Sequence, residues 1–171
     1  AVDLYEQLNP IDQQTTRQLF LRLVTLGEGT EDTRRRVFRS ELISLAGDDD
    51  SMDRTISVFT RYRLLTLDRD TNTREPTVEI AHESLIREWG NLRDWLNSSR
   101  EDLRMQRRVM IAAADWERFV QDLSYLARGA QLETFQAWSN ATNLELTERE
   151  ANYIQQSIAR HEAEQRTIAE Q

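Results

Sequence analysis

The residues of this chain that are best placed for chemistry surround a histidine near the middle of the sequence. Val78 and Ile80 alternate with polar neighbours as in a β-strand, whereas Leu85 and Trp89 follow at helical spacing. His82 therefore falls at a strand-to-helix junction, a rigid corner from which a side chain can point into a neighbouring domain. A neutral imidazole can donate a hydrogen bond to a phosphate oxygen, and protonation strengthens this bond.

Two interpretations of this corner stay open. His82 either points into a neighbouring domain or is a structural residue that caps the following helix or lies in the core. Glu83 is either an acid favoured by the positive end of the helix dipole or the group that orients His82. A run of three arginines upstream either contacts phosphate or forms a solvated loop that nearby acids balance. The arginines are Arg34, Arg35 and Arg36, and the acids are Glu28, Glu31 and Asp32.

The basic residues exclude several classes of chemistry. All 22 of them are arginines, and the chain contains neither lysine nor cysteine. A phosphate-binding P-loop needs a lysine, and so does Schiff-base catalysis. Thiol catalysis and cysteine-based zinc sites need cysteine. Two histidines are too few for a histidine-built metal site, so we predict no catalytic residue, no metal ligand and no enzymatic activity of the chain itself.

Three short helices are expected in the first half of the chain. Asn9 and Pro10 are typical of a helix start, and the apolar residues from Ile11 to Val24 predict a helix that ends at Gly27 and Gly29. A second helix is predicted to begin at Ser40 and to end at Gly47. The acidic residues 48–50 with Ser51 predict the start of a third helix, whose apolar residues are Met52, Ile56, Phe59 and Tyr62.

A strand alternation follows at residues 64–68 and returns at residues 77–81 after a turn-rich loop. Three helices followed by a two-stranded wing are the winged-helix arrangement, which we predict for residues 1–90. Residues 91–171 read as an all-helical subdomain, so the expected fold class is mainly α.

The expected helices of this subdomain are separated by polar breaks. One runs to about Val120, another covers residues 130–138, and Thr147 with Glu150 forms a capping-box pattern that opens the last. Beyond His161 the last helix is almost wholly polar, as in a linker between domains. The four tryptophans, at helical spacing, are expected in the core rather than in a ligand site. They are Trp89, Trp95, Trp116 and Trp138.

The charge of the chain argues against a nucleic-acid partner. The formal net charge is −8, and residues 1–80 hold fifteen acids against eleven arginines. Binding of DNA rests on neutralising its phosphates, and acids open the third helix, which would enter the major groove. We therefore expect no nucleic acid, although Arg54, Arg61 and Arg63 keep a DNA-binding winged helix open as an alternative.

No apolar run approaches the roughly 18 residues of a membrane span, and no signal peptide opens the chain. We expect a cytoplasmic protein. Because the chain begins at Ala1 without a methionine and ends in a polar helix, we interpret it as a piece of a longer protein.

Five stretches together resemble the C-terminal part of a STAND-type NTPase module of large bacterial signalling proteins. They are LFLRLV (residues 19–24), GEGTEDTRRR (27–36), VEIAHESLIREW (78–89), LRDWL (92–96) and ARGAQL (127–132). The resemblance spans roughly residues 10–150. It implies a P-loop NTPase domain upstream and WD or other repeats downstream, both in the same chain. It also implies that this part couples the nucleotide state to those repeats, with ADP or ATP bound by the parent protein and no cofactor in this part.

Residues 80–83 also lie where related NB-ARC ATPases carry a Met-His-Asp motif, whose histidine contacts the β-phosphate of ADP. By this resemblance His82 is the candidate nucleotide-phosphate sensor of the parent protein. Ala81 and Glu83 stand where the motif has methionine and aspartate. The alternatives are a plain protein-interaction module, in which the histidine is structural, and the DNA-binding winged helix.

Overall fold

The computed structural model describes residues 1–45 and 49–171, and 63% of the chain is helical. The chain divides into two compact units, residues 1–100 and 101–171. This division reflects which residues pack together. The domain limits expected from the sequence, 1–90 and 91–171, stay a prediction.

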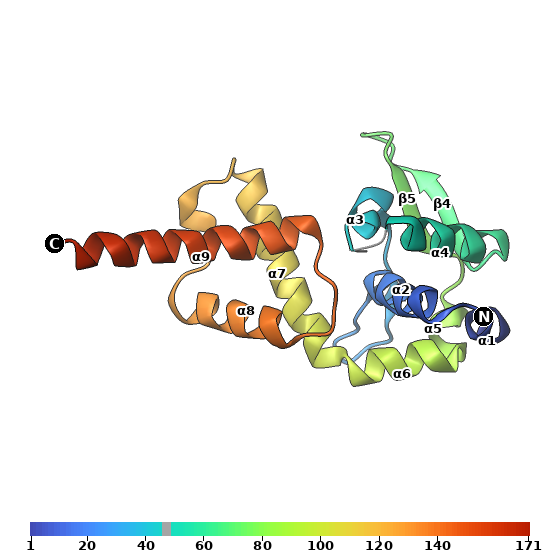
Figure 1. Cartoon of the computed structure of the whole chain (residues 1–171). Helices are drawn as coiled ribbons and strands as arrows, with labels where there is room; N and C mark the ends of the chain where they lie inside the picture. The colour runs from blue at the N-terminus through green and yellow to red at the C-terminus, as the bar shows by residue number, and fades with distance from the viewer. Residues whose placement is uncertain (46–48) are drawn as a thin grey trace. The chain divides into compact units, whose positions relative to one another are not determined.

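The first unit contains six helices and five strands in the part of the chain that is described (Figure 1). The helices are α1 (Val2–Glu6), α2 (Pro10–Arg22), α3 (Arg39–Ile43), α4 (Asp49–Arg61), α5 (Ser84–Glu88) and α6 (Gly90–Ser98). The strands are β1 (Val24–Thr25), β2 (Thr33–Arg34), β3 (Val37–Phe38), β4 (Leu65–Arg69) and β5 (Pro76–Ile80). α2 packs against both α4 and α6, and its residues Leu19, Phe20 and Leu23 are fully buried.

Two small antiparallel sheets belong to this unit. β1 pairs with β2, and the second sheet has the strand order β3-β5-β4. In the second sheet Leu65 lies opposite Ile80, and Val37 lies opposite Val78. The two strands expected at residues 64–68 and 77–81 are thus present as β4 and β5, whereas β1, β2 and β3 were not expected.

The predicted boundaries of the first helices need correction. α2 begins at Pro10 with Asn9 as its N-cap, as expected, but it ends at Arg22 because Val24 is buried in strand β1. α3 begins at Arg39 rather than at Ser40, and no side chain caps it. The predicted end at Gly47 and the predicted cap at Asp48 lie outside the described residues.

Two residues expected in the apolar faces of these helices are exposed. Ile11, in the first turn of α2, and Tyr62, directly after α4, are both more than half exposed. The tryptophan prediction is confirmed for Trp89 and Trp116, which are buried, and Trp95 and Trp138 are partly buried.

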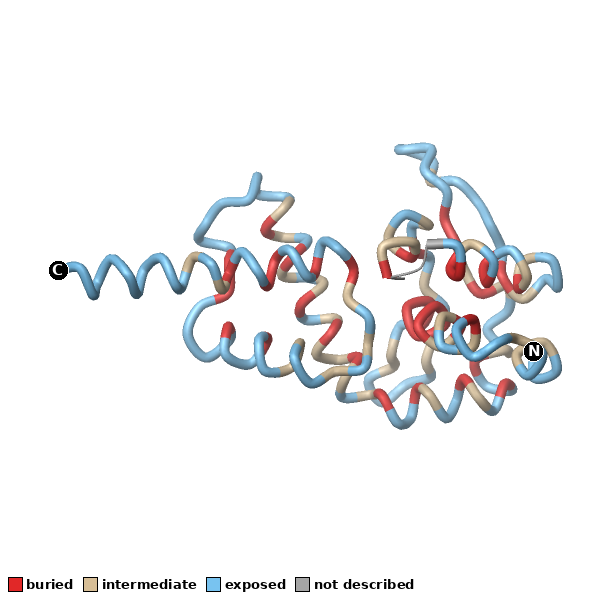
Figure 2. Tube along the Cα trace, viewed as in Figure 1, coloured by how far each residue is buried: buried red, intermediate tan, exposed pale blue. Residues whose placement is uncertain are grey.

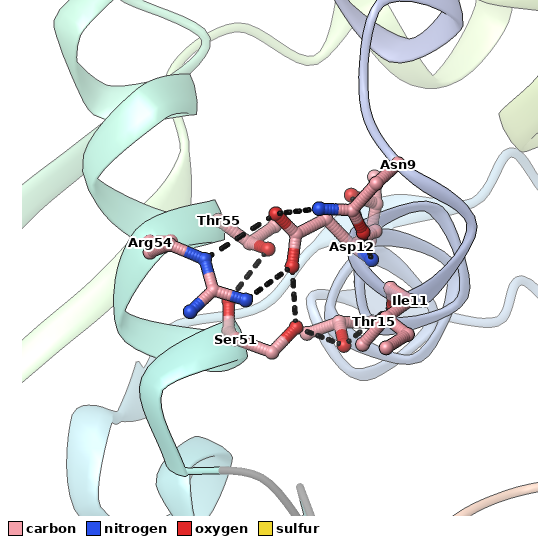
Figure 3. A network of polar contacts seen from close by, with 8 residues as sticks. Asn9, Ile11, Asp12, Thr15, Ser51, Arg54 and Thr55 are labelled. Atoms are coloured by element: carbon pink, nitrogen blue, oxygen red, sulfur yellow. Dashed lines mark hydrogen bonds and ion pairs between the residues drawn. The ribbon is translucent and has the colours of Figure 1, made fainter.

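A carboxylate joins α2 to α4 (Figure 3). Asp12, near the start of α2, accepts a hydrogen bond from the Ser51 hydroxyl at 2.7 Å and one from Arg54 Nη2 at 3.0 Å. Asn9 caps the same helix, because its side-chain oxygen accepts from the Asp12 amide at 2.8 Å. Burial disfavours the ionised carboxylate, but the hydrogen bonds from Arg54, Ser51 and Asn9 outweigh this cost and lower the pKa of Asp12 below its ordinary 3.8.

The second unit is helical throughout its described elements. Helix α7 spans Arg100–Arg118, and all of it except Arg100 belongs to this unit. The unit also contains a short 3₁₀ helix (Leu123–Tyr125), α8 (Gly129–Ala141) and α9 (Glu148–Ala169). Its core comprises Val109, Ala113, Trp116, Leu126, Ala127, Leu132, Phe135, Tyr153 and Ile154. Figure 2 shows that the C-terminal half of α9 is exposed, in agreement with its polar sequence.

The predicted long helix stops short of Val120. α7 ends at Arg118, and the next turn places Val120 and Gln121 at φ angles of 56° and 58°. This left-handed region is rare for a β-branched residue and ends the helix. Val120 is therefore 89% exposed instead of buried in a helical stripe.

The capping box of α9 is confirmed and is tied to α7. The Thr147 hydroxyl accepts a hydrogen bond from the Glu150 amide, and the Glu150 carboxylate accepts from the Thr147 amide. Glu150 is buried, and its other oxygen accepts from Gln106 Nε2 of α7 at 2.9 Å. The cap thus fixes both the start of α9 and its contact with α7.

Replacing Thr147 with alanine is expected to destabilise the start of α9 by about 1 kcal/mol, because one amide of the first turn loses its acceptor. Native-state hydrogen exchange in the whole chain measures this as faster exchange of the first amides of α9. Thr167→Ala is the matched control, because the Thr167 hydroxyl bonds within the exposed end of α9. Equal exchange in the Thr147 variant and the wild type would contradict the role of the cap.

Candidate functional site

His82 lies on the corner between β5 and α5, and the backbone on both sides of it is fixed. The Ala81 amide donates to the Leu64 carbonyl at 3.0 Å, and the His82 carbonyl accepts from the Leu85 amide at 3.1 Å. The His82 side chain is exposed and makes no hydrogen bond or ion pair with any described residue. The corner therefore presents an imidazole with both nitrogens available to a ligand.

The His82 side chain is exposed and is therefore not packed in the core. The N-cap of α5 is Glu83, and no side chain makes a capping hydrogen bond there. Glu83 is also exposed, and it is not hydrogen-bonded to His82 in the part of the chain that is described.

The three arginines of the upstream loop contact distant parts of the first unit. Arg34 Nη1 donates to the Ala81 carbonyl at 3.0 Å and to the Ile80 carbonyl at 3.3 Å. Arg34 and Arg36 also lie 3.8 and 3.9 Å from the carboxylate of Glu79 on β5. Arg34 thus braces the two residues that precede His82.

Arg35, the middle arginine, faces other partners. Its Nη1 donates to the Arg22 carbonyl at 3.0 Å, and its Nη2 lies 3.8 Å from Glu41. Two of the acids that lie near the arginine run are therefore Glu79 and Glu41. Sequence reasoning missed the pairs with Glu79 because Glu79 is more than forty residues away from the arginines.

Asp32 of the same loop has a buried role of its own. Its carboxylate accepts two parallel hydrogen bonds from Arg100, at 2.7 and 3.0 Å, and one from the Gly27 amide at 2.8 Å. The hydrogen bonds from Arg100 hold the pKa of Asp32 below its ordinary value, against the opposing effect of burial. A Cβ at position 27 would lie 2.2 Å from the Thr30 carbonyl oxygen, so only glycine fits this tight loop.

Other chemistry finds little support around this corner. No group of three or more potential metal ligands occurs in residues 1–45 and 49–171. None of the helices in these residues combines the length and apolarity needed to cross a membrane. On α4, Arg54 forms an ion pair with Asp12. Arg54 is one of the three arginines that could contact DNA.

These features define a mainly helical module that carries an exposed histidine on a strand-to-helix corner. The family model for novel STAND NTPase 1 matches residues 1–123, which include all of the first unit and α7. The chain belongs to the novel STAND NTPase 1 family. No curated protein and no solved structure matches the chain.

Proposed function

We propose that this chain is the non-catalytic regulatory arm of a bacterial STAND signalling NTPase. In the resting state His82 contacts a phosphate of ADP that is bound to an NTPase domain upstream. Exchange of ADP for ATP releases the arm, and the helical second half passes the movement to downstream repeats such as WD repeats. The observation that carries this proposal is the exposed imidazole of His82, without a partner in the described residues, on a braced corner.

The arrangement of the first unit supports a winged helix as the carrier of this histidine. α2, α3 and α4 precede the β4–β5 hairpin, and β3 joins the hairpin as a third strand. His82 follows the second strand of that hairpin directly. We place the winged helix at residues 1–90, and the helical subdomain with its polar linker helix at residues 91–171.

The residues at the corner fit a phosphate group. A neutral imidazole offers one N–H donor, and an imidazolium offers two. The side chain of Arg34 is 39% exposed beside the same corner, and its guanidinium adds a positive charge. ADP and ATP place their terminal phosphates differently, so such a contact can distinguish the two nucleotides and bias a two-state equilibrium. The arm would act in the cytoplasm, where these nucleotides are abundant.

The test uses the full-length protein, with the NTPase domain present, and compares wild type with His82→Ala. A hydrogen bond to a charged group contributes about 1.5–3 kcal/mol, so the variant is expected to release ADP about ten- to a hundredfold faster. Co-purified ADP and its release rate are measured. His161→Ala is the matched control, because His161 lies on the exposed part of α9. Unchanged ADP release in the His82 variant, with its fold intact, would reject the sensor role.

A second candidate function, a protein-interaction module, is favoured by one apolar patch in the second unit. The patch follows α7 and consists of Phe119, Val120, Leu123 and Tyr125, all exposed. Phe119 and Tyr125 stack with their ring centroids 4.4 Å apart. Exposed apolar groups that lie together are typical of surfaces that bind other proteins. Under this function the His82 variant behaves as the wild type, whereas Val120→Asp and Leu123→Asp abolish partner binding.

A further inference from the structure

We infer that the segment from Asp32 to Arg34 is a mechanical link between the start of α7 and the corner that carries His82. Asp32 binds Arg100, the first residue of α7, and Arg34 binds the backbone next to His82. A displacement of α7 would then reach His82 through two contacts that lie two residues apart. This inference rests on the proposed function and names the way in which the same site is regulated.

The first contact is a strong anchor. Arg100 and Asp32 form a two-point, charge-assisted pair, and their side chains are only 30% and 12% exposed. The neighbouring pair Glu31–Arg87 differs, because its atoms are 3.5 Å apart and both side chains are more than half exposed. The Gly27 amide adds a third hydrogen bond to Asp32, so the loop cannot easily shift without losing the pair.

The second contact, between Arg34 and the end of β5, lies where β3 no longer pairs with β5. β3 pairs with β5 at Val37–Val78 and Phe38–Thr77, so the carbonyls of Ile80 and Ala81 lie beyond the end of β3. Arg34 Nη1 donates to both carbonyls, and its bond to the Ile80 carbonyl is partly buried whereas its bond to the Ala81 carbonyl is exposed. Arg34 therefore holds the backbone that directly precedes His82.

The two contacts connect a helix that spans both units to the sensor. α7 begins at Arg100 in the first unit and continues through residues 101–118 of the second. The position of α7 can be coupled to His82 because only the short strand β2 (Thr33–Arg34), which is paired with β1, follows Asp32 and carries the Arg34 side chain. Coupling between two sites is reciprocal. A nucleotide that binds His82 therefore also restricts the displacement of the start of α7.

The test measures the release of a fluorescent ADP analogue from the full-length protein in a double-mutant design. Asp32→Asn and Arg34→Gln break the link, and Arg100→Lys keeps the charge of Arg100 but loses its two-point geometry. The matched controls are Glu31→Gln in the same loop and Arg36→Gln. Arg36, like Arg34, lies near Glu79, but within the described residues it makes no hydrogen bond to the Ile80 or Ala81 carbonyl. Each variant is also made in the His82→Ala background.

We expect the three link variants to release the analogue roughly 2- to 30-fold faster than wild type, and the two controls to remain within about twofold. In the His82→Ala background the link variants are expected to add nothing, because the link acts only through His82. If Asp32→Asn does not fold, Arg100→Lys still tests the link, because it weakens the same Asp32–Arg100 pair.

Three outcomes would overturn the link. If His82→Ala accelerates release but the link variants do not, the link is wrong and the proposed function stands. If the link variants accelerate release equally in the His82→Ala background, they act on the fold and not on the sensor. If His82→Ala itself leaves release unchanged, the proposed function fails and the link fails with it.

Discussion

Replacement of Trp89 by alanine is expected to lower the free energy of unfolding of the first unit by about 3–5 kcal/mol. Trp89 is only 2% exposed and lies at the centre of an aromatic cluster. Its ring centroid lies 5.0 Å from that of Phe20, 5.3 Å from that of Trp95 and 6.1 Å from those of Tyr5 and Phe59. The variant would lose these contacts and leave a cavity where α2, α4 and α6 meet.

Trp89→Phe is the informative control for this prediction. The indole N–H of Trp89 is buried and has no hydrogen-bond partner in the described part of the chain. Phenylalanine keeps an aromatic ring and removes that donor, so its cost is expected to be about 2 kcal/mol or less. Urea unfolding followed by circular dichroism measures both variants. A cost below about 1 kcal/mol for Trp89→Ala would show that the cluster does not organise the unit.

The second large effect is expected at Asp12. Asp12→Asn removes the charge that Arg54 and Ser51 contact, and hydrogen bonds to a charged group contribute about 1.5–3 kcal/mol. We expect a loss of roughly 2–3 kcal/mol near neutral pH. Asp94→Asn is the matched control, because Asp94 is exposed on α6 and makes no hydrogen bond or ion pair with a described residue. Equal stability of the Asp12 and Asp94 variants would contradict the prediction.

The same network predicts how stability depends on pH. The folded protein holds the pKa of Asp12 below the value of about 3.9 that an aspartate has in an unfolded chain. The stabilisation is therefore fully present above about pH 4 and is lost as the pH falls through the lower, folded pKa. Asp32 acts in the same direction through Arg100. In the Asp12→Asn variant the free energy of unfolding, measured by urea titration at several pH values, should fall less steeply below pH 4 than in the wild type. An equally steep fall in both proteins would contradict the role of Asp12.

Local signals in the sequence predicted those parts of the fold that are held by neighbouring residues. Asn9 with Pro10 marks the start of α2, and Thr147 with Glu150 marks the start of α9, because a cap acts within three or four residues. The β4–β5 hairpin was visible for the same reason: its two strands are adjacent in the sequence and antiparallel.

The missed features depend on contacts between distant residues. β1, β2 and β3 are two residues long, too short for an alternation to be detected, and they exist only through their pairing. The Arg100–Asp32 pair joins residues far apart in the chain, and so does the contact of Arg34 with Ala81. His82 could be placed at its corner from the sequence, but the brace beside it could not.

The central claim, a contact between the His82 corner and a bound nucleotide, is tested most directly by hydrogen exchange in the full-length protein. Exchange of the backbone amides of residues 81–88 is measured with ADP bound and with a slowly hydrolysed ATP analogue bound. If His82 holds ADP, these amides are more protected with ADP, and His82→Ala removes the difference. Equal exchange with both nucleotides, while exchange in the NTPase domain shows that both are bound, would contradict the account.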